Sequence, residues 1–209
     1  MKIRNIKRVT AILIVLLTSI MSYGQRDAFF PCIDVSESIP QIKEYNKNLE
    51  KVFISNFKQG FIIRFIAKPS FDPEYAFQIH QLCDSAFVIE ALKMNTNIWD
   101  TKKTDSINYY CRAIDTKLLQ VIESLFKTLI NNAQNKSAFM AGMDGVEYNF
   151  LYNSDKGIKC VQAQSLYTNS TLSEVLEVID DLMLYAQNED YDASLIEEKI
   201  KSLCMRIGC

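Results

Sequence analysis

The chain has little of what most catalytic sites require. Its 209 residues include one histidine, His80, so a nucleophile–base pair would have to use that residue or do without histidine. Its six cysteines contain no C-x-x-C pair, which argues against a thioredoxin-like redox site and a zinc ribbon. No acidic loop has the glycine and ligand spacing of an EF-hand. The sequence therefore predicts no catalytic residue, no metal site and no cofactor.

The chain also lacks an apolar run of the about 20 residues that a membrane-spanning helix needs. Its apolar run near the start, residues 11–21, follows four basic residues and precedes the small residues Ser22 and Gly24. A basic start, a short apolar run and a small-residue cleavage site are typical of a secretory signal peptide. We therefore expect a signal peptide over residues 1–24 and one mature domain over residues 25–209 without a membrane span. The alternative, an uncleaved anchor, is disfavoured by the short run.

The chain also has little excess of charge of one sign. Removing the 24 leader residues leaves 185 residues and, with four basic side chains gone, changes the formal net charge from −2 to −6. A mildly acidic chain is a poor partner for nucleic acid or for an anionic membrane. We expect an exported protein, periplasmic or extracellular, whose partner is a protein or a small molecule of the cell envelope.

The cysteines favour cross-links over free thiols. All six follow the predicted leader, at Cys32, Cys83, Cys111, Cys160, Cys204 and Cys209. An even number in an oxidising compartment indicates disulfides, although the spacing does not choose among the many pairings. Cys111 and Cys160 are expected to face the core, as buried thiols or as one internal bridge. We also expect at least one bridge to tie a terminal segment to the body.

Helical spacing is most extended over residues 105–131. The apolar residues of this stretch that form one stripe are Ile107, Cys111, Ile114, Leu118, Val121, Ile122, Leu125 and Leu129. Leu119, Phe126 and Ile130 widen the stripe, so the pattern predicts one long central helix covered from two sides. Because the stripe carries no ionisable group except Cys111, this helix is interpreted as a scaffold.

The rest of the chain alternates between two periods. Spacing typical of helices covers residues 38–53, 171–186 and 194–207, whereas strand patterns cover residues 61–68, 75–81, 86–93, 146–152 and 158–164. Short turns join the first three strands into a meander and the last two into a hairpin. Such segregated runs predict an α+β fold: an antiparallel sheet packed on the long central helix and two C-terminal helices.

One face of the predicted meander is the candidate binding surface. Its polar residues are Arg64, Gln78, His80 and Glu90. With turns centred near Phe71 and Cys83, Arg64 and Gln78 align with Val88, and Glu90 falls in the neighbouring row with Ala76. A mixed polar and apolar face can bind a ligand or partner; the alternatives are that the N-terminal helix covers it or that it is merely solvated.

Two segments resemble known sequences. Pro69-Ser-Phe-Asp-Pro-Glu-Tyr75 and Met143-Asp-Gly-Val-Glu-Tyr-Asn-Phe150 resemble segments of small uncharacterised secreted proteins of Gram-negative bacteria. The resemblance implies no activity. The residues favour a non-enzymatic binding or interaction module of the periplasm or envelope. The alternatives are a carboxylate-dependent hydrolase acting on glycans or peptides, and a structural assembly partner without a small ligand.

Overall fold

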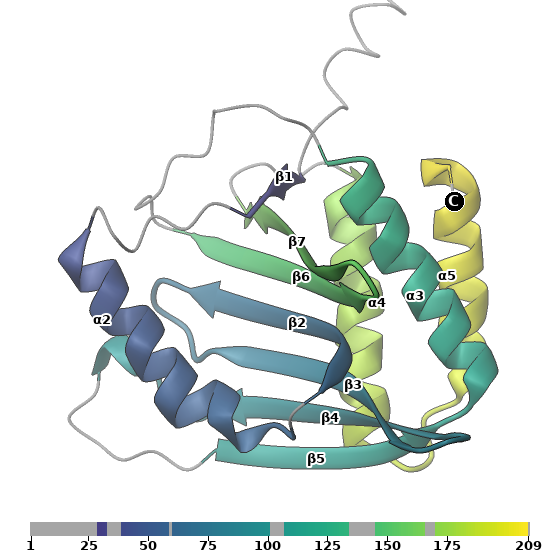
Figure 1. Cartoon of the computed structure of the whole chain (residues 1–209), viewed down its shortest axis with the longest axis horizontal. Helices are drawn as coiled ribbons and strands as arrows, with labels where there is room; N and C mark the ends of the chain where they lie inside the picture. Colours follow the sequence, from purple (N-terminus) through teal and green to yellow (C-terminus); the bar gives the residue numbers. More distant parts are fainter. Residues whose placement is uncertain are drawn as a thin grey trace, which may run out of the picture.

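An antiparallel sheet and four α-helices make up the described part of the chain (Figure 1). The structure, a computed structural model, describes residues 29–32, 39–58, 60–100, 107–133, 145–165 and 170–208. The predicted signal peptide and Cys209 lie outside these residues. The predicted α+β class with an antiparallel sheet is confirmed.

The sheet is larger than the sequence predicts, with seven strands in the order β1-β7-β6-β2-β3-β4-β5. The strands are β1 Phe30–Pro31, β2 Phe61–Pro69, β3 Tyr75–Cys83, β4 Ala86–Met94, β5 Ile107–Ile114, β6 Val146–Ser154 and β7 Gly157–Gln164. Strands β2 to β5 follow one another as a four-stranded meander, and the β6–β7 hairpin joins it through β2. The predicted three-stranded meander is thus part of a longer one.

Helices α3, α4 and α5 lie on one face of the sheet and α2 lies on the other (Figure 1). The helices are α2 Pro40–Asn48, α3 Thr116–Asn131, α4 Ser170–Gln187 and α5 Ala193–Ile207. Helices α3 and α4 contact the strands, whereas α5 packs mainly on α3 and α4. The main core therefore lies between the sheet and this helical layer, and it includes contacts of Phe126 with the strand residues Phe77 and Phe150.

The predicted helix over residues 105–131 is wrong in its first third. Ile107–Ile114 forms the edge strand β5, which pairs with β4 along its whole length. The spacing of its apolar residues also fits a helix, but tyrosine and isoleucine favour strands, and β4 supplies backbone partners. The predicted single helix is thus a strand followed by a helix.

The helix that does form begins at Thr116. The Asp115 side chain accepts a hydrogen bond of 2.7 Å from the backbone N–H of Leu118, which satisfies one of the free donors at the helix start. The aspartate is therefore an N-cap, and it marks the boundary that periodicity alone does not reveal.

Helix α2 covers the outer face of the sheet, which we define as the face turned away from α3, α4 and α5. Tyr45, Leu49 and Phe53, spaced four residues apart, are buried in an apolar cluster with residues of β2, β3 and β4. After α2 the chain continues through a π-helical turn, Leu49–Phe53, and a 3₁₀ turn, Ile54–Asn56. This cluster is separate from the main core, and it packs α2 and the two turns that follow it against the outer face of the sheet.

Candidate functional site

The four predicted polar residues lie together on the outer face. Arg64 of β2 is opposite Gln78 of β3, and Gln78 is opposite Glu90 of β4. His80 lies two residues further along β3 on the same face. The row therefore crosses three neighbouring strands, because residues opposite one another in antiparallel strands point to the same side.

The register between β3 and β4 differs from the predicted one by two residues. Val88, expected beside Gln78, is opposite His80, and Glu90 takes its place in the row. Cys83 pairs with Ala86, so the turn is centred later than expected, and the pairing then shifts by one residue between Cys83 and Gln81. An irregularity of this kind leaves no signal in an alternating pattern.

This face is covered, which was one of the alternatives. The exposed fraction is 0% for Gln78, 3% for His80 and 1% for Glu90, while Arg64 is half-buried. The chain that follows α2 contacts the row: the Lys58 main chain is hydrogen-bonded to Gln78 and Glu90, and the Phe57 ring lies beside Arg64. Arg64 is consequently the most solvent-accessible of the four.

Glu90 is the centre of a buried hydrogen-bond network. Its Oε1 accepts 2.6 Å from the Tyr109 hydroxyl, and its Oε2 accepts 2.8 Å from Gln78 Nε2 and 3.2 Å from the Lys58 backbone N–H. Burial and the hydrogen bond to Glu90 raise the pKa of Tyr109. Sequence reasoning missed Tyr109 because β5 was expected to be helical, and missed Lys58 because its main chain makes the contact.

Arg64 is bound to an amide rather than to a carboxylate. Its Nε and Nη2 donate to Gln78 Oε1 at 3.1 and 2.7 Å. Its guanidinium carbon lies 4.2 Å from the centre of the Phe61 ring and 5.5 Å from that of Phe57. Burial lowers its pKa, against the raising influence of Glu50 and Glu90. The cation is therefore held rigidly in a partly apolar setting.

His80 is buried, and its ring nitrogens lack hydrogen bonds to the described residues. Its Nδ1 is 3.4 Å from Glu90 Oε2, outside hydrogen-bond geometry, and neither ring nitrogen has a hydrogen-bond partner among the described residues. Buried polar atoms are nearly always hydrogen-bonded, and a buried donor or acceptor without a hydrogen bond costs about 1–3 kcal/mol. A buried histidine in this condition suits a site that a further group completes.

A second buried carboxylate, that of Glu74, contacts α2 through Tyr45. Glu74 accepts 2.9 Å from the Tyr45 hydroxyl and 3.0 Å from the Ile98 backbone N–H. Tyr45 also stacks on Trp99, with ring centres 4.6 Å apart. Burial raises the pKa of Glu74, opposed by these hydrogen bonds. Because the residue precedes β3 in a proline turn, no periodic pattern singled it out.

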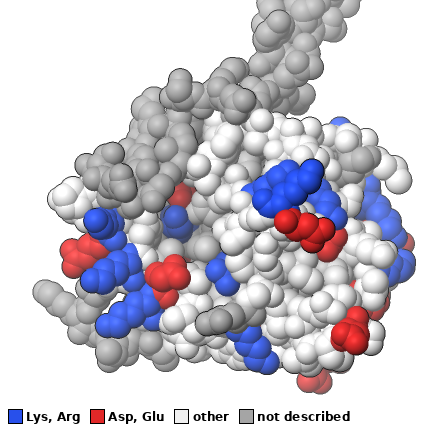
Figure 2. Space-filling view, viewed as in Figure 1, with Lys and Arg blue, Asp and Glu red and all other residues white. Residues whose placement is uncertain are grey.

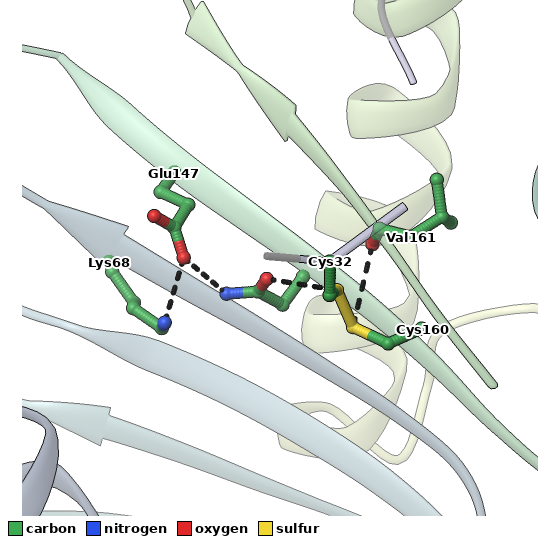
Figure 3. The surroundings of a disulfide bond; sticks show 6 residues. Cys32, Lys68, Glu147, Cys160 and Val161 are labelled. Carbon is green, nitrogen blue, oxygen red and sulfur yellow. Dashed lines mark hydrogen bonds and ion pairs between the residues drawn. A yellow bond between two sulfur atoms is a disulfide. The ribbon is translucent and has the colours of Figure 1, made fainter. Parts of the chain in front are cut away.

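A third polar group lies beside the disulfide on β6 (Figure 3). Lys68 Nζ and Asn149 Nδ2 both donate to Glu147 Oε1, at 2.7 and 2.8 Å. The Sγ of Cys32 lies 3.6 Å from Asn149 Oδ1. These contacts pair the group internally, and the ion pair between Lys68 and Glu147 ties β2 to β6.

The disulfide joins Cys32 to Cys160 across 128 residues. It follows β1, which pairs with β7, so it ties the N-terminal segment to the sheet as expected. The expectation for Cys160 is corrected, since it is opposite Leu151 and Val161 is opposite the buried Phe150.

The expectation for Cys111 is wrong as well. Cys111 is a free and exposed thiol on β5, because that segment is an edge strand rather than a buried helix. Cys83 is free and exposed, and Cys204, on α5, is buried.

Surface charge does not select a partner on the side that carries α2. Acidic and basic side chains alternate there around α2, between largely uncharged areas (Figure 2). Within the described ranges, His, Cys, Asp and Glu side chains do not gather in threes as a metal site requires. None of the helices described is long and apolar enough to cross a membrane.

No known protein family, no curated protein and no solved structure matches this chain. The chemistry of the outer face therefore has to be argued from its own geometry.

The two buried carboxylates do not form a catalytic pair. Along β3, Ala76 and its partner Leu92 separate the position of Glu74 from the row that contains Glu90. Each carboxylate is engaged by its own donors, from Tyr45 and Ile98 in one case and from the Glu90 network in the other. Acid–base hydrolysis of a glycoside needs two carboxyl groups flanking one bond.

Proposed function

We propose that this chain is a non-enzymatic binding module, exported to the periplasm or the extracellular space, whose ligand site is the outer face around Arg64, Gln78, His80 and Glu90. The observation that carries the proposal is His80, which is buried and makes no hydrogen bond to a described residue through either ring nitrogen. Its Nδ1 lies 3.4 Å from Glu90 Oε2, an oxygen that already accepts hydrogen bonds from Gln78 and Lys58. An apolar side chain would cost less at this position, so the imidazole is best explained by a group that binds there.

The accessibility of the row supports a small ligand rather than a flat protein surface. Gln78, His80 and Glu90 are buried, the Lys58 main chain contacts Gln78 and Glu90, and Arg64 is half-buried at their side. Arg64 is the one side chain of the row that solvent reaches, so a small molecule can approach the row beside it, whereas the buried residues offer no flat surface to a protein. Export rests on the predicted leader, and the Cys32–Cys160 disulfide fits an oxidising compartment.

The proposal is tested by protein-observed NMR with a small-molecule fragment library. Fragments that bind are expected to shift the amide signals of β2, β3 and β4 near the four residues. His80→Phe, which fills the space of the ring without its nitrogens, is expected to weaken these fragments. Gln81→Ala, at an exposed position of the same strand, is the matched control and is expected to leave them unchanged.

Two results would overturn the proposal. The first is a screen whose fragments never map to the outer face, or bind His80→Phe as they bind the wild type. The second is glycan or peptide hydrolysis by the wild type that Glu90→Gln abolishes, since that would make the carboxylate catalytic.

A further inference from the structure

We infer that the ligand of this site carries an acidic group, a carboxylate or a phosphate, and that Arg64 binds it. The inference rests on the proposed function and adds the chemical class of the ligand. It starts from the charge of Arg64, which no carboxylate of the described residues approaches within 4.0 Å. Glu50 and Glu90 act on it only over a longer range.

The amide of Gln78 keeps Arg64 apart from the buried acid. Gln78 accepts from Arg64 through Oε1 and donates to Glu90 through Nε2 at 2.8 Å. Arg64 on β2 and Glu90 on β4 are separated by β3, whose Gln78 lies between them in the row. The interposed amide orients the guanidinium while leaving its charge available, because a neutral acceptor compensates it less than a carboxylate does.

The position of the guanidinium favours an anion over a neutral ligand. The Phe61 ring lies 4.2 Å from the guanidinium carbon, and burial already lowers the pKa of the side chain. A charged group removed from water gains more from an opposite charge than an exposed one does, and arginine's planar donors match carboxylate and phosphate oxygens. His80, on the same face, adds an imidazole that can donate to a second oxygen of the ligand.

The test is a set of NMR titrations with succinate, inorganic phosphate and the neutral succinamide. Succinate or phosphate is expected to shift the signals of Arg64 and Gln78, and succinamide is expected to bind at least about tenfold more weakly. Arg64→Met is expected to lose anion binding by about tenfold or more, and Arg64→Lys, which keeps the charge without the planar donors, by a smaller factor. Lys127→Met, which removes a cation lying 4.9 Å from the ring centre of Tyr152, is the control and should change neither.

The outcomes separate this inference from the proposed function. If succinamide binds as well as succinate, or if Arg64→Met binds the anions as the wild type does, the inference is wrong. If neutral fragments meanwhile bind the outer face and depend on His80, the proposed function stands without it. If Arg64→Met does not fold, judged by circular dichroism, the Arg64→Lys titration decides, and equal anion affinity in that variant overturns the inference.

Discussion

At the scale of single residues, the outer face shows polar side chains kept in an interior where apolar ones would pack at lower cost. Glu90 receives hydrogen bonds from Tyr109, Gln78 and the Lys58 main chain, so the carboxylate is compensated by donors rather than by a cation. Such a network is stable only while every member has its partner, because an unpaired polar group in the interior is costly.

Glu90→Gln is expected to destabilise the fold by about 1–3 kcal/mol, because the new amide N–H₂ faces donors instead of accepting from them. Urea unfolding followed by circular dichroism measures the change. Glu123→Gln is the control: its carboxylate pairs with Lys127 at 2.7 Å near the surface, and its loss should cost below about 1 kcal/mol. Equal midpoints for the two variants would contradict the central place of Glu90.

Glu74 predicts a pH dependence with a definite sign. Burial raises the pKa of Glu74 in the folded chain above its unfolded value, so the folded state binds the proton more tightly. Stability from this group therefore increases as pH falls through the folded pKa, and the gain is complete below the unfolded one. The free energy of unfolding of the wild type, relative to Glu74→Gln, should rise as the pH is lowered from 8 towards 4.5.

Asp180, whose pKa burial also raises, is present in both proteins and cancels in this difference. A difference that stays flat with pH, or that falls on acidification, would contradict the assignment to Glu74.

At the scale of elements, α3 is a scaffold that is shorter than its apolar stripe suggests. The strand that precedes it uses its own side chains to fix the helical layer. Arg112 of β5 donates to the backbone carbonyls of Tyr185, Asn188, Glu189 and Tyr191, and its guanidinium carbon lies 3.7 Å from the centre of the Tyr185 ring. A cation at the end of a helix compensates its free carbonyls, so β5 anchors the turn between α4 and α5.

Leu125→Ala in α3 is expected to cost about 2–5 kcal/mol, because the side chain is 0% exposed and its removal leaves a cavity. Leu195→Ala, at a position of α5 that is 59% exposed, should cost less than about 0.5 kcal/mol. Thermal and urea unfolding compare the two. A Leu125→Ala protein as stable as the Leu195→Ala protein would place α3 outside the core.

At the scale of the whole molecule, β1 and Cys32 link the N-terminal part of the chain to the distant strand β7. Strand β1 is the edge strand that pairs with β7, and Cys32–Cys160 links two positions 128 residues apart. Helix α2 lies on the side of the sheet opposite α3, α4 and α5. The cross-link restricts the unfolded chain more than any local contact does.

Replacing both Cys32 and Cys160 by serine is expected to lower the free energy of unfolding by about 2–5 kcal/mol. Urea unfolding of the oxidised wild type against the double variant measures it. In the native wild type, the exposed thiols of Cys83 and Cys111 should react readily with a thiol reagent. Non-reducing peptide mapping that finds Cys32 and Cys160 as free thiols would contradict the pairing.

Local patterns in the sequence determined much of the fold. The alternation of Tyr75, Phe77 and Ile79 predicts a strand whose odd-numbered residues face the core, and Phe77 and Ile79 are fully buried there. The last two helices are likewise found near their predicted bounds, with Gly208 in the left-handed conformation that ends α5. Such features depend on side chains a few residues apart, so the local chain is sufficient to specify them.

The tertiary structure alone decided the rest. Residues 107–114 fit either period, and β4 made them a strand by supplying hydrogen-bond partners along their whole length. The irregular turn near Cys83 set the row in which Glu90 meets Gln78, and spatial proximity chose Cys160 for Cys32. The burial of His80 depends on a segment that reaches the sheet from another part of the chain. Contacts between distant residues arise from packing and pairing in three dimensions, and no local periodicity records them.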